Sequence, residues 1–493
     1  MKQFTKYLIV AILCSPVFFI NIKTSHDWGD DFAQYIHQAH NIVHGIPQSE
    51  TGYIYNPNYP LLGPPSYPAG FPILLAPVVA LFGNDILHLD LYISFFLFAL
   101  ALLTFHFLLR YYSALISALL VIILIYNPWT LNFKMEIMSD IPFTFFLLLC
   151  VYLYLHKNSY TLLTSISLAL LSGFLISIRN IGIVFIAATV IHMLRELYYY
   201  RAAIKSRSFD YRKLKSRAII VAGGLTTHLL INKVLFPSAG DRIFSYEYIF
   251  NGVQLLDFVK ANLHYYMAVL RYFFEPGNED WQFVALFSSS MIFAFIFLGF
   301  VKKVTEKIGF LEVLVSIYLL IIIVYPYSNA GVRFLLPLIP FLLYYAVEGL
   351  KAIRIKVGMN RSVLAILLGV FVLCSYQSGL SEIFKREKDT LAGPQQAESL
   401  ELFTYIQQHT EVNSRFNFAK PRALSLYAGR NAMSVKRMQS MRTISNDLTS
   451  NNINYILSNS ELRDDSLLAF IRTHESELER TWSNSKFTLY RRR

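Results

Sequence analysis

Long apolar runs separated by short polar segments occupy most of the first 380 residues. A membrane-spanning helix needs roughly 20 mostly apolar residues, so these runs predict roughly eleven transmembrane helices. The break between the fifth and sixth runs is placed at Arg179 and Asn180, because a charge within a span is costly. The runs lie at about residues 6–22, 87–109, 113–131, 141–156, 160–178, 180–194, 218–236, 282–300, 308–326, 332–350 and 362–380. The expected fold class is an α-helical polytopic membrane protein.

The polar remainder consists of two long loops and a tail. The loops cover about residues 23–86 and 237–281, and the tail begins near residue 381. The tail has a helix-like pattern near 396–409 and strand-like patterns at 453–457 and 486–490. Its length suits one small α/β domain. The sequence therefore predicts a membrane domain over 1–380, which includes both loops, and a separate α/β domain over 381–493.

Composition and charge support this interpretation and give it an orientation. Apolar residues make up 55% of the chain and charged residues 15%, and the mean hydropathy is +0.42. The net charge of +12 comes largely from basic residues in alternate short loops, of which 195–217 is the richest. Basic loops stay in the cytoplasm, so the N-terminus is expected there, with both long loops and the tail on the extracytoplasmic face. This distribution argues against a nucleic-acid partner.

The apolar runs also bear on the cysteines and on the signal-like N-terminus. All three cysteines fall in apolar runs, which indicates neither a disulfide framework nor a zinc site. Lys2 and Lys6 precede an apolar core, as in a secretory signal, but no small-x-small cleavage site follows closely. We expect a retained first span.

The first loop contains the most distinctive cluster of acidic residues. Asp27, Asp30 and Asp31 follow the first span, and a helical apolar pattern then runs from Phe32 to Gly45. This pattern predicts a short amphipathic helix along the membrane surface. One of the adjacent acids would cap that helix. The cap leaves the other acids unexplained, and they are candidates for chemistry.

Histidines and tyrosines surround this helix. His37, His40 and His44 share one face, with His26 upstream, and they either bind a divalent ion or form a solvated polar face. Downstream, Tyr67 belongs to a Pro- and Tyr-rich segment whose tyrosines anchor the chain at the interface or stack on a sugar or prenyl chain. The apolar stretch 71–83 is too short to cross and is expected to dip into the interface.

A second group of charges is expected at the outer ends of spans. Asp140 lies just before Pro142, and Arg179 and Arg333 reach the same depth. Asp140 either caps the next helix or pairs with the arginines, which could instead clamp a phosphate. In the second loop, a helical pattern over 253–274 carries basic and aromatic residues suited to an anionic lipid head.

Together these features resemble the GT-C glycosyltransferase superfamily, and within it the family 39-like group of protein O-mannosyltransferases and lipid A aminoarabinose transferases. The resemblance covers the layout of about residues 1–350 and rests on the order of five motifs. They are the acidic pair after the first span, the amphipathic helix ending at Gly45, the Pro-Pro-x-Tyr-Pro segment ending in Leu-Phe-Gly, a Ser-Asp-x-Pro turn and an Arg-Phe-x-x-Pro span.

The resemblance implies a transferase that takes a sugar from a polyprenyl-phosphate donor on the extracytoplasmic face and passes it to a lipid, glycan or protein, with inversion in a single displacement. Asp30 or Asp31 would be the general base or its orienter. The family's acidic motif has Glu at the second position and its Tyr one residue earlier, so this chain's Tyr35 departs from it. Asp140 would match the second acidic position.

The remaining roles follow from the same resemblance. Arg179, Arg333 and Arg271 would bind the donor phosphate, and Tyr35, Tyr67 and His264 would bind substrate. Some members hold a divalent metal near the first loop, for which Glu50, His264 or the first-loop histidines are candidates; no motif fixes such a site here.

Three other function classes stay open. A polysaccharide polymerase or ligase would share the large outer loops and the arginines, but would not need the acidic first loop or the α/β tail. A transporter or flippase would place its charges near the bilayer midplane and often shows repeated halves, which this sequence lacks. A catalytically inactive scaffold is the third. The sequence identifies neither the sugar nor the acceptor, and the tail holds no catalytic motif.

Overall fold

The computed structural model describes most of the chain. The described residues are 3–156, 161–199, 211–237, 252–271, 282–325, 331–353, 361–385, 391–462 and 464–493. Their contacts define two compact units. We call Met1–Ile22, Asp90–Ile231 and Ser245–Lys388 the helical unit, and Lys23–Leu89, Asn232–Phe244 and Asp389–Arg493 the mixed unit.

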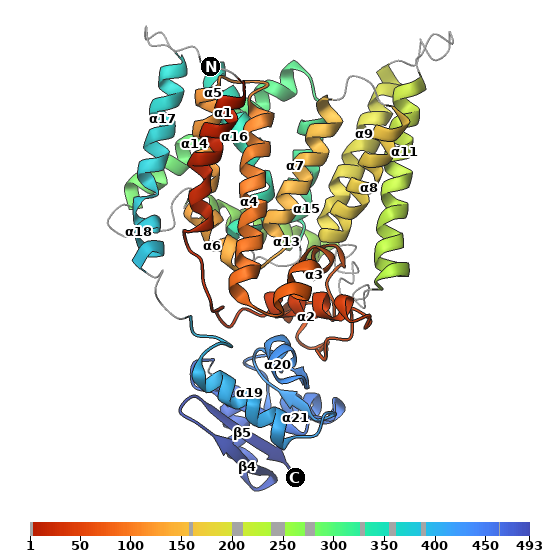
Figure 1. Ribbon diagram of the computed structural model, residues 1–493, viewed down its shortest axis with the longest axis vertical. Helices are drawn as coiled ribbons and strands as arrows, with labels where there is room; N and C mark the ends of the chain where they lie inside the picture. The colour runs from red at the N-terminus through yellow and green to blue at the C-terminus, as the bar shows by residue number, and fades with distance from the viewer. Residues whose placement is uncertain are drawn as a thin grey trace. The chain divides into compact units, whose positions relative to one another are not determined.

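The helical unit consists mainly of apolar helices. In Figure 1, α1, α4, α7, α8, α9 and α11 run nearly parallel to one another. The α-helices are α1 (Gln3–Cys14), α4 (Ile86–Leu108, whose first turn belongs to the mixed unit), α5 (Ala114–Ile125), α6 (Pro128–Met135), α7 (Asp140–His156), α8 (Leu162–Ile178), α9 (Ile183–Tyr199), α11 (Tyr211–Leu229), α13 (Gly252–Arg271), α14 (Gln282–Glu306), α15 (Phe310–Ile323), α16 (Ile339–Ala352), α17 (Arg361–Ser375) and α18 (Gln377–Lys385). Short helical turns are η1 (Ser15–Phe18), η3 (Asn180–Gly182), η4 (Leu230–Leu235, whose last four residues belong to the mixed unit), η6 (Gly331–Phe334) and η7 (Leu336–Leu338).

Several of these helices can cross a bilayer. Among the described residues, five helices are long and apolar enough, and a sixth span is possible if the bent pair α5 and α6 counts as one. Five shorter apolar helices of 10–17 residues accompany them. Each predicted apolar run contains helix, which confirms the polytopic fold class, while the total of eleven crossings stays a prediction.

Two breaks in the apolar pattern have local causes. The predicted run 113–131 is two helices bent by 53°. Asn127 caps the second helix by accepting a hydrogen bond from the Trp129 amide at 2.9 Å, and Pro128 has no amide hydrogen to continue the first. The break expected at Arg179 is confirmed, because α8 ends at Ile178 and Arg179 has extended backbone angles.

A buried ion pair joins α4 and α6. Lys134 Nζ lies 3.2 Å from Asp90 Oδ1, and the two side chains are 0% and 1% exposed. Lys134 Nζ also donates a hydrogen bond to the Asn21 carbonyl at 3.0 Å. A charge buried this completely needs such partners, so the pair fixes the relative position of the two helices.

The mixed unit contains a five-stranded sheet in the order β2-β1-β3-β5-β4. The β1 strand pairs in parallel with β2 and β3, while β5 is antiparallel to β3 and β4. Figure 1 shows β4 and β5 as neighbouring arrows with α19 beside the sheet. The elements are α2 (Asp31–Val43), η2 (Pro60–Leu62), α3 (Gly70–Phe82), α19 (Ala397–His409), β1 (Arg415–Asn417), α20 (Pro421–Ala428), β2 (Asn431–Met433), α21 (Met441–Ser450), β3 (Tyr455–Asn459), α22 (Asp465–Thr473), η8 (Glu475–Glu477), β4 (Leu478–Ser483) and β5 (Phe487–Arg492). The small α/β tail domain expected from the sequence is present.

The first loop is attached to this sheet. Tyr53 forms a parallel bridge with Ala432 of β2, and the Ala432 amide donates to the Gly52 carbonyl at 2.9 Å. Further along the loop, Asn56 and Asn58 donate to the two Asp447 carboxylate oxygens at 3.0 and 2.7 Å. The first loop and the tail therefore pack as one body within the mixed unit. The domain boundaries at residues 380 and 381 stay a prediction.

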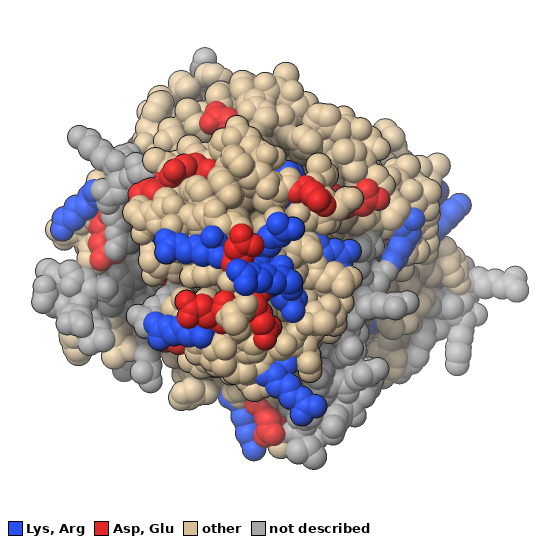
Figure 2. Space-filling view, turned by 90° about the horizontal axis from the view of Figure 1, so that it is seen from below, with Lys and Arg blue, Asp and Glu red and all other residues tan. Residues whose placement is uncertain are grey.

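Charges of both signs lie on the surface. Figure 2 shows Lys and Arg side chains next to Asp and Glu side chains near the middle of the face that it views. Within the mixed unit, Lys486 Nζ lies 2.7 Å from Glu461 Oε1. Neighbouring charges of opposite sign cancel much of each other's field in water.

Candidate active site

The acidic pair of the first loop lies at the start of α2. Asp30 occupies the N-cap position and Asp31 the first helical position. The helix ends near Gly45, whose φ of +69° suits glycine. The expectation that an acidic side chain caps the helix is wrong in one respect, because the Asp30 side chain makes no cap hydrogen bond. Its carboxylate faces a buried cation instead.

That cation is Arg422, in the first turn of α20. Its side chain is 0% exposed, and its Nη1 donates to Asp31 Oδ1 at 3.0 Å. Its Nε lies 3.7 Å from Asp30 Oδ2, an ion-pair distance too long for a hydrogen bond. A positive side chain in the first turn of a helix opposes the helix dipole. The two carboxylates compensate for that position.

Aromatic side chains and a carbonyl complete the surroundings of Arg422. The guanidinium carbon lies 4.7 Å from the Tyr53 ring centre and 5.2 Å from that of Tyr67. Nη2 donates to the Pro64 carbonyl at 2.9 Å. At Gly63, whose φ is +106°, an added Cβ would lie 2.6 Å from Nη2, so only glycine leaves room for the guanidinium.

Tyr67 connects this arginine to Asp31 directly. Its hydroxyl donates to Asp31 Oδ1 at 2.6 Å and accepts from Arg422 Nη1 at 3.2 Å. Burial, opposed by the Arg422 charge, raises the pKa of Tyr67 well above its usual value, so the phenol keeps its proton as a donor. Tyr35 stacks on Tyr67 with ring centres 4.5 Å apart and is itself 4% exposed. The structure thus brings four of the expected site residues together, namely Asp30, Asp31, Tyr35 and Tyr67.

The two carboxylates differ in environment. The Asp30 side chain is 8% exposed and that of Asp31 is 29% exposed. Burial raises the pKa of Asp30 to about 6, although Arg422 and Lys420 lower it. Asp31 is therefore the carboxylate that a substrate can reach, and Asp30 lies behind it.

A second cluster forms within the helical unit. Asp140, at the first position of α7, is 2% exposed and accepts hydrogen bonds from both expected arginines. Arg333 Nε donates to Asp140 Oδ2 at 3.0 Å, and Arg179 Nη1 donates to Oδ1. Of the two alternatives for Asp140, pairing with the arginines applies. The arginine side chains keep 16% and 22% exposure, which leaves part of each accessible to an anion.

The second-loop candidates lie on α13. His264 is exposed on this helix. The hydroxyl of its neighbour Tyr265 accepts a hydrogen bond from the Gly331 amide at 2.5 Å, which positions the turn η6 that carries Arg333. Arg271 is the last residue of α13, and its side chain lies outside the described residues.

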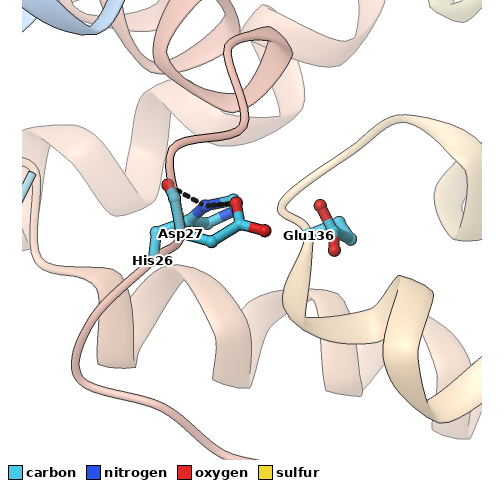
Figure 3. Close-up of side chains that lie close together, drawn as sticks. All are labelled: His26, Asp27 and Glu136. Carbon is cyan, nitrogen blue, oxygen red and sulfur yellow. Dashed lines mark hydrogen bonds and ion pairs between the residues drawn. The ribbon is translucent and has the colours of Figure 1, made fainter. Parts of the chain in front are cut away.

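The first-loop histidines do not converge on one point. His40 and His44 stack with ring centres 4.0 Å apart, and the His37 ring centre is 6.4 Å from that of His40. Burial lowers the pKa of His37 to about 4. His26 Nδ1 lies 3.2 Å from Asp27 Oδ1 (Figure 3), which gives two neighbouring potential ligands. A third candidate, Glu50, is exposed.

Arg422 is the functional residue that sequence reasoning missed. The tail segment around it, FNFAKPRALSLYAGR, matches no catalytic motif. One available signal was Pro421, which marks the start of a helix and so places the following arginine in its first turn. An arginine there is electrostatically unfavourable unless acids face it. The sequence could not show which acids these are.

Comparisons with known proteins agree with this architecture. The crystal structure of ArnT from Cupriavidus metallidurans bound to undecaprenyl phosphate is 11% identical, has a TM-score of 0.56, and is aligned over 99% of this chain and 98% of that one. The Archaeoglobus fulgidus oligosaccharyltransferase in complex with Zn and sulfate is 10% identical, has a TM-score of 0.58, and is aligned over 99% and 73%. The AglB oligosaccharyltransferase of the same organism, in complex with an inhibitory peptide and a dolichol-phosphate, is 10% identical with a TM-score of 0.56, over 92% and 69%.

The fold class is therefore that of the GT-C glycosyltransferases, as the sequence resemblance predicted, in an integral membrane protein. The chain belongs to the DUF2079 family of predicted membrane proteins, whose sequence profile matches residues 31–489. None of the curated proteins matches the sequence.

Proposed function

We propose that this protein is a membrane glycosyltransferase that moves a sugar from a polyprenyl-phosphate donor to a lipid, glycan or protein acceptor. The observation that supports this most strongly is the environment of Asp31. Asp31 is a partly exposed carboxylate held by a tyrosine and a buried arginine, in a chain with the GT-C fold. The polyprenyl phosphates in the ArnT and AglB structures motivate the donor class.

In the proposed reaction Asp31 is the general base. It removes the proton of the acceptor hydroxyl or amine as that group bonds to the anomeric carbon. The bond from that carbon to the phosphate oxygen breaks at the same time, so the configuration inverts and no covalent enzyme intermediate forms. Tyr67 and Arg422 fix the orientation of the Asp31 carboxylate. The carboxylate is therefore already aligned when it accepts the proton.

The donor phosphate is assigned to the arginines of the helical unit. A leaving phosphate gains negative charge in the transition state, and fixed guanidinium groups stabilise that charge. Arg179 and Arg333 are held by Asp140 and still expose part of their surface. Asp140 is then a positioning residue, with Arg271 and His264 as further candidates for lipid-phosphate and substrate contact. Tyr35, which is buried, would act by supporting Tyr67.

The proposal includes an orientation and a role for metal. The N-terminus lies in the cytoplasm and the tail outside the plasma or inner membrane, because the basic loops alternate in that sense. A divalent ion remains a candidate cofactor near the first loop, where His26 and Asp27 are adjacent. Addition and chelation of divalent cations during the assay would test it.

The test is sugar transfer by the full-length protein in membranes. Wild type is compared with Asp31→Asn, Asp30→Asn and Asp140→Asn over a panel of polyprenyl-phosphate sugars, with the exposed Glu411→Gln as a matched control. We expect transfer by wild type and by the control, and a loss of about 100-fold or more in Asp31→Asn, since a general base contributes that much. The anomeric configuration of the product reports inversion.

Other results would favour the rival functions. A ligase or polymerase would transfer a preassembled glycan and ignore single-sugar donors. A flippase would move labelled lipid-linked sugar across a vesicle membrane without cleaving it, and Asp31→Asn would leave that flux intact. Transfer that is equal in wild type and Asp31→Asn, at equal expression, would remove Asp31 as the base.

A further inference from the structure

Arg422 has an unusual combination of position and contacts. Its side chain is fully buried, yet it contacts two acids from a segment 391 residues away in the sequence. A guanidinium without water needs nearby negative charge to remain in the interior. Asp30, whose side chain is 8% exposed, likewise needs a nearby positive charge. Each of these buried charges therefore stabilises the other, and both lie behind the accessible Asp31.

We propose that Arg422 is a positioning residue that keeps the adjacent carboxylates of Asp30 and Asp31 ionised and aligned. The tail domain would then supply an essential part of the first-loop site. This inference rests on the proposed function, in which Asp31 is the base. It assigns to the tail a role in the chemistry itself, in addition to any role in recognising the acceptor.

The two acids lie next to each other and close to the same buried guanidinium. Neighbouring carboxylates in a poorly hydrated site compete for ionisation, because the second negative charge is repelled by the first. A guanidinium that contacts both removes this competition, and its rigid fork also fixes their directions. Because Arg422 is fully buried, it cannot touch a substrate, so it acts only through the carboxylates.

The other groups around the pair cannot replace this charge. Lys420, just before α20, also lowers the pKa of Asp30, but Arg422 is the larger influence. Tyr53 and Tyr67 keep their protons at neutral pH, because burial raises the pKa of Tyr53 to about 12 and that of Tyr67 well above its usual value. Without Arg422, one proton would stay bound to the pair of acids at a higher pH than in the wild type.

A structural role in holding the domain together is the competing explanation, and a matched residue separates the two. Arg430, in the same domain, is 8% exposed and donates to Thr410 Oγ1 at 3.1 Å and to the Gln407 carbonyl at 3.0 Å. These partners are neutral. Arg430→Met therefore removes a buried arginine from the domain without touching a carboxylate of the site.

The first measurement is the pH profile of sugar transfer for wild type, Arg422→Met, Arg422→Lys and Arg430→Met. We expect Arg422→Met to lose about 100-fold in kcat at pH 6.5, with little change in KM, and to recover at least tenfold by pH 8.5. Arg422→Lys keeps the charge without the fork, so its acid limb should stay near that of wild type at a reduced kcat. Arg430→Met should keep the wild-type profile.

The second measurement needs no activity. The infrared band of protonated carboxyl groups is titrated in the full-length protein, and Asp30→Asn identifies the Asp30 contribution. Arg422→Met should raise the midpoint of that contribution by at least one pH unit, and Arg430→Met should leave it in place. Adding Asp30→Asn to Arg422→Met should move the acid limb of the rate profile back toward wild type, because only one carboxylate remains.

The outcomes separate this inference from the proposed function. If wild type transfers no sugar but Arg422→Met shifts the infrared midpoint, the proposed function fails and the electrostatic role of Arg422 stands. If Arg422→Met leaves the midpoint unchanged, or lowers the rate equally at every pH, Arg422 is not a positioning residue for the acids.

Discussion

Replacing Asp30 by Asn should stabilise the mixed unit at neutral pH, although the change removes half of an ion pair. Two effects compete at this position. Burial penalises the carboxylate, and Arg422 at 3.7 Å attracts it. The pKa of Asp30, raised to about 6 from a usual 3.8, indicates that burial is the larger effect. Asn has nearly the same shape and carries no charge, so it avoids the penalty.

The sign and size follow from proton linkage. The folded protein binds the Asp30 proton more tightly than the unfolded chain does, so this group's contribution to the free energy of unfolding is greatest below about pH 4. It declines as the pH rises to about 6 and stays low above that. The difference of roughly two pH units corresponds to about 3 kcal/mol. Asp30→Asn should therefore match wild type at about pH 3 and exceed it by about 3 kcal/mol at pH 7.5.

Thermal unfolding of the full-length protein in lipid nanodiscs measures this difference. Trp28 is a local fluorescence probe, because its ring packs edge-on against Phe418 and Phe487 within the mixed unit. A unit of this size shifts its Tm by roughly 2–4 °C per kcal/mol, so Asp30→Asn should gain about 6–12 °C at pH 7.5 and almost nothing at about pH 3. A variant that melts below wild type at pH 7.5 would show that the attraction of Arg422 exceeds the burial penalty.

Three further changes test other contacts. Tyr67→Phe removes the hydrogen bond to Asp31 and should lower the kcat of sugar transfer by about tenfold, since a hydrogen bond to a charged group contributes about 1.5–3 kcal/mol. An unchanged kcat would exclude a role for Tyr67 in orienting Asp31. Asp140→Ala leaves two arginines without their acid and should cost about 3–5 kcal/mol of stability in thermal unfolding, whereas a full melting curve like that of wild type would contradict the cluster. Lys134→Met isolates the buried Asp90 and should cost a similar amount, and adding Asp90→Leu should recover most of it in a double-mutant cycle.

The helices were predictable because their signal is local. Apolar runs indicate spans directly, and Gly45 indicated the end of α2. The bend after Ile125 was not predicted, although Asn127 and Pro128 carry the capping pattern that causes it. Apolar composition hid this signal, because a run of spanning length looks continuous when only hydropathy is considered.

The candidate site was only partly predictable, because its charges come from distant segments. The acids Asp30, Asp31 and Asp140 stood out as charges beside apolar runs, and the pairing of Asp140 with Arg179 and Arg333 was one of two stated alternatives. Sequence patterns contain no distances, so they could not separate the buried acid of the first loop from the accessible one. The backbone hydrogen bonds that attach the first loop to the tail's sheet join distant segments, and sequence periodicity does not show such a pairing.

The contact between Arg422 and the acids suggests how the first loop and the tail depend on each other. Burying a guanidinium costs several kcal/mol unless acids face it, and burying Asp30 carries a comparable penalty. Loss of the arginine alone would leave Asp30 as an uncompensated charge in the interior, whereas loss of Asp30 alone leaves Arg422 paired with Asp31. Family members that lack the arginine should therefore tend to have a neutral residue at the position of Asp30, whereas members that keep both acids should keep it. Independent variation of the two positions would mean that this contact is incidental to the site.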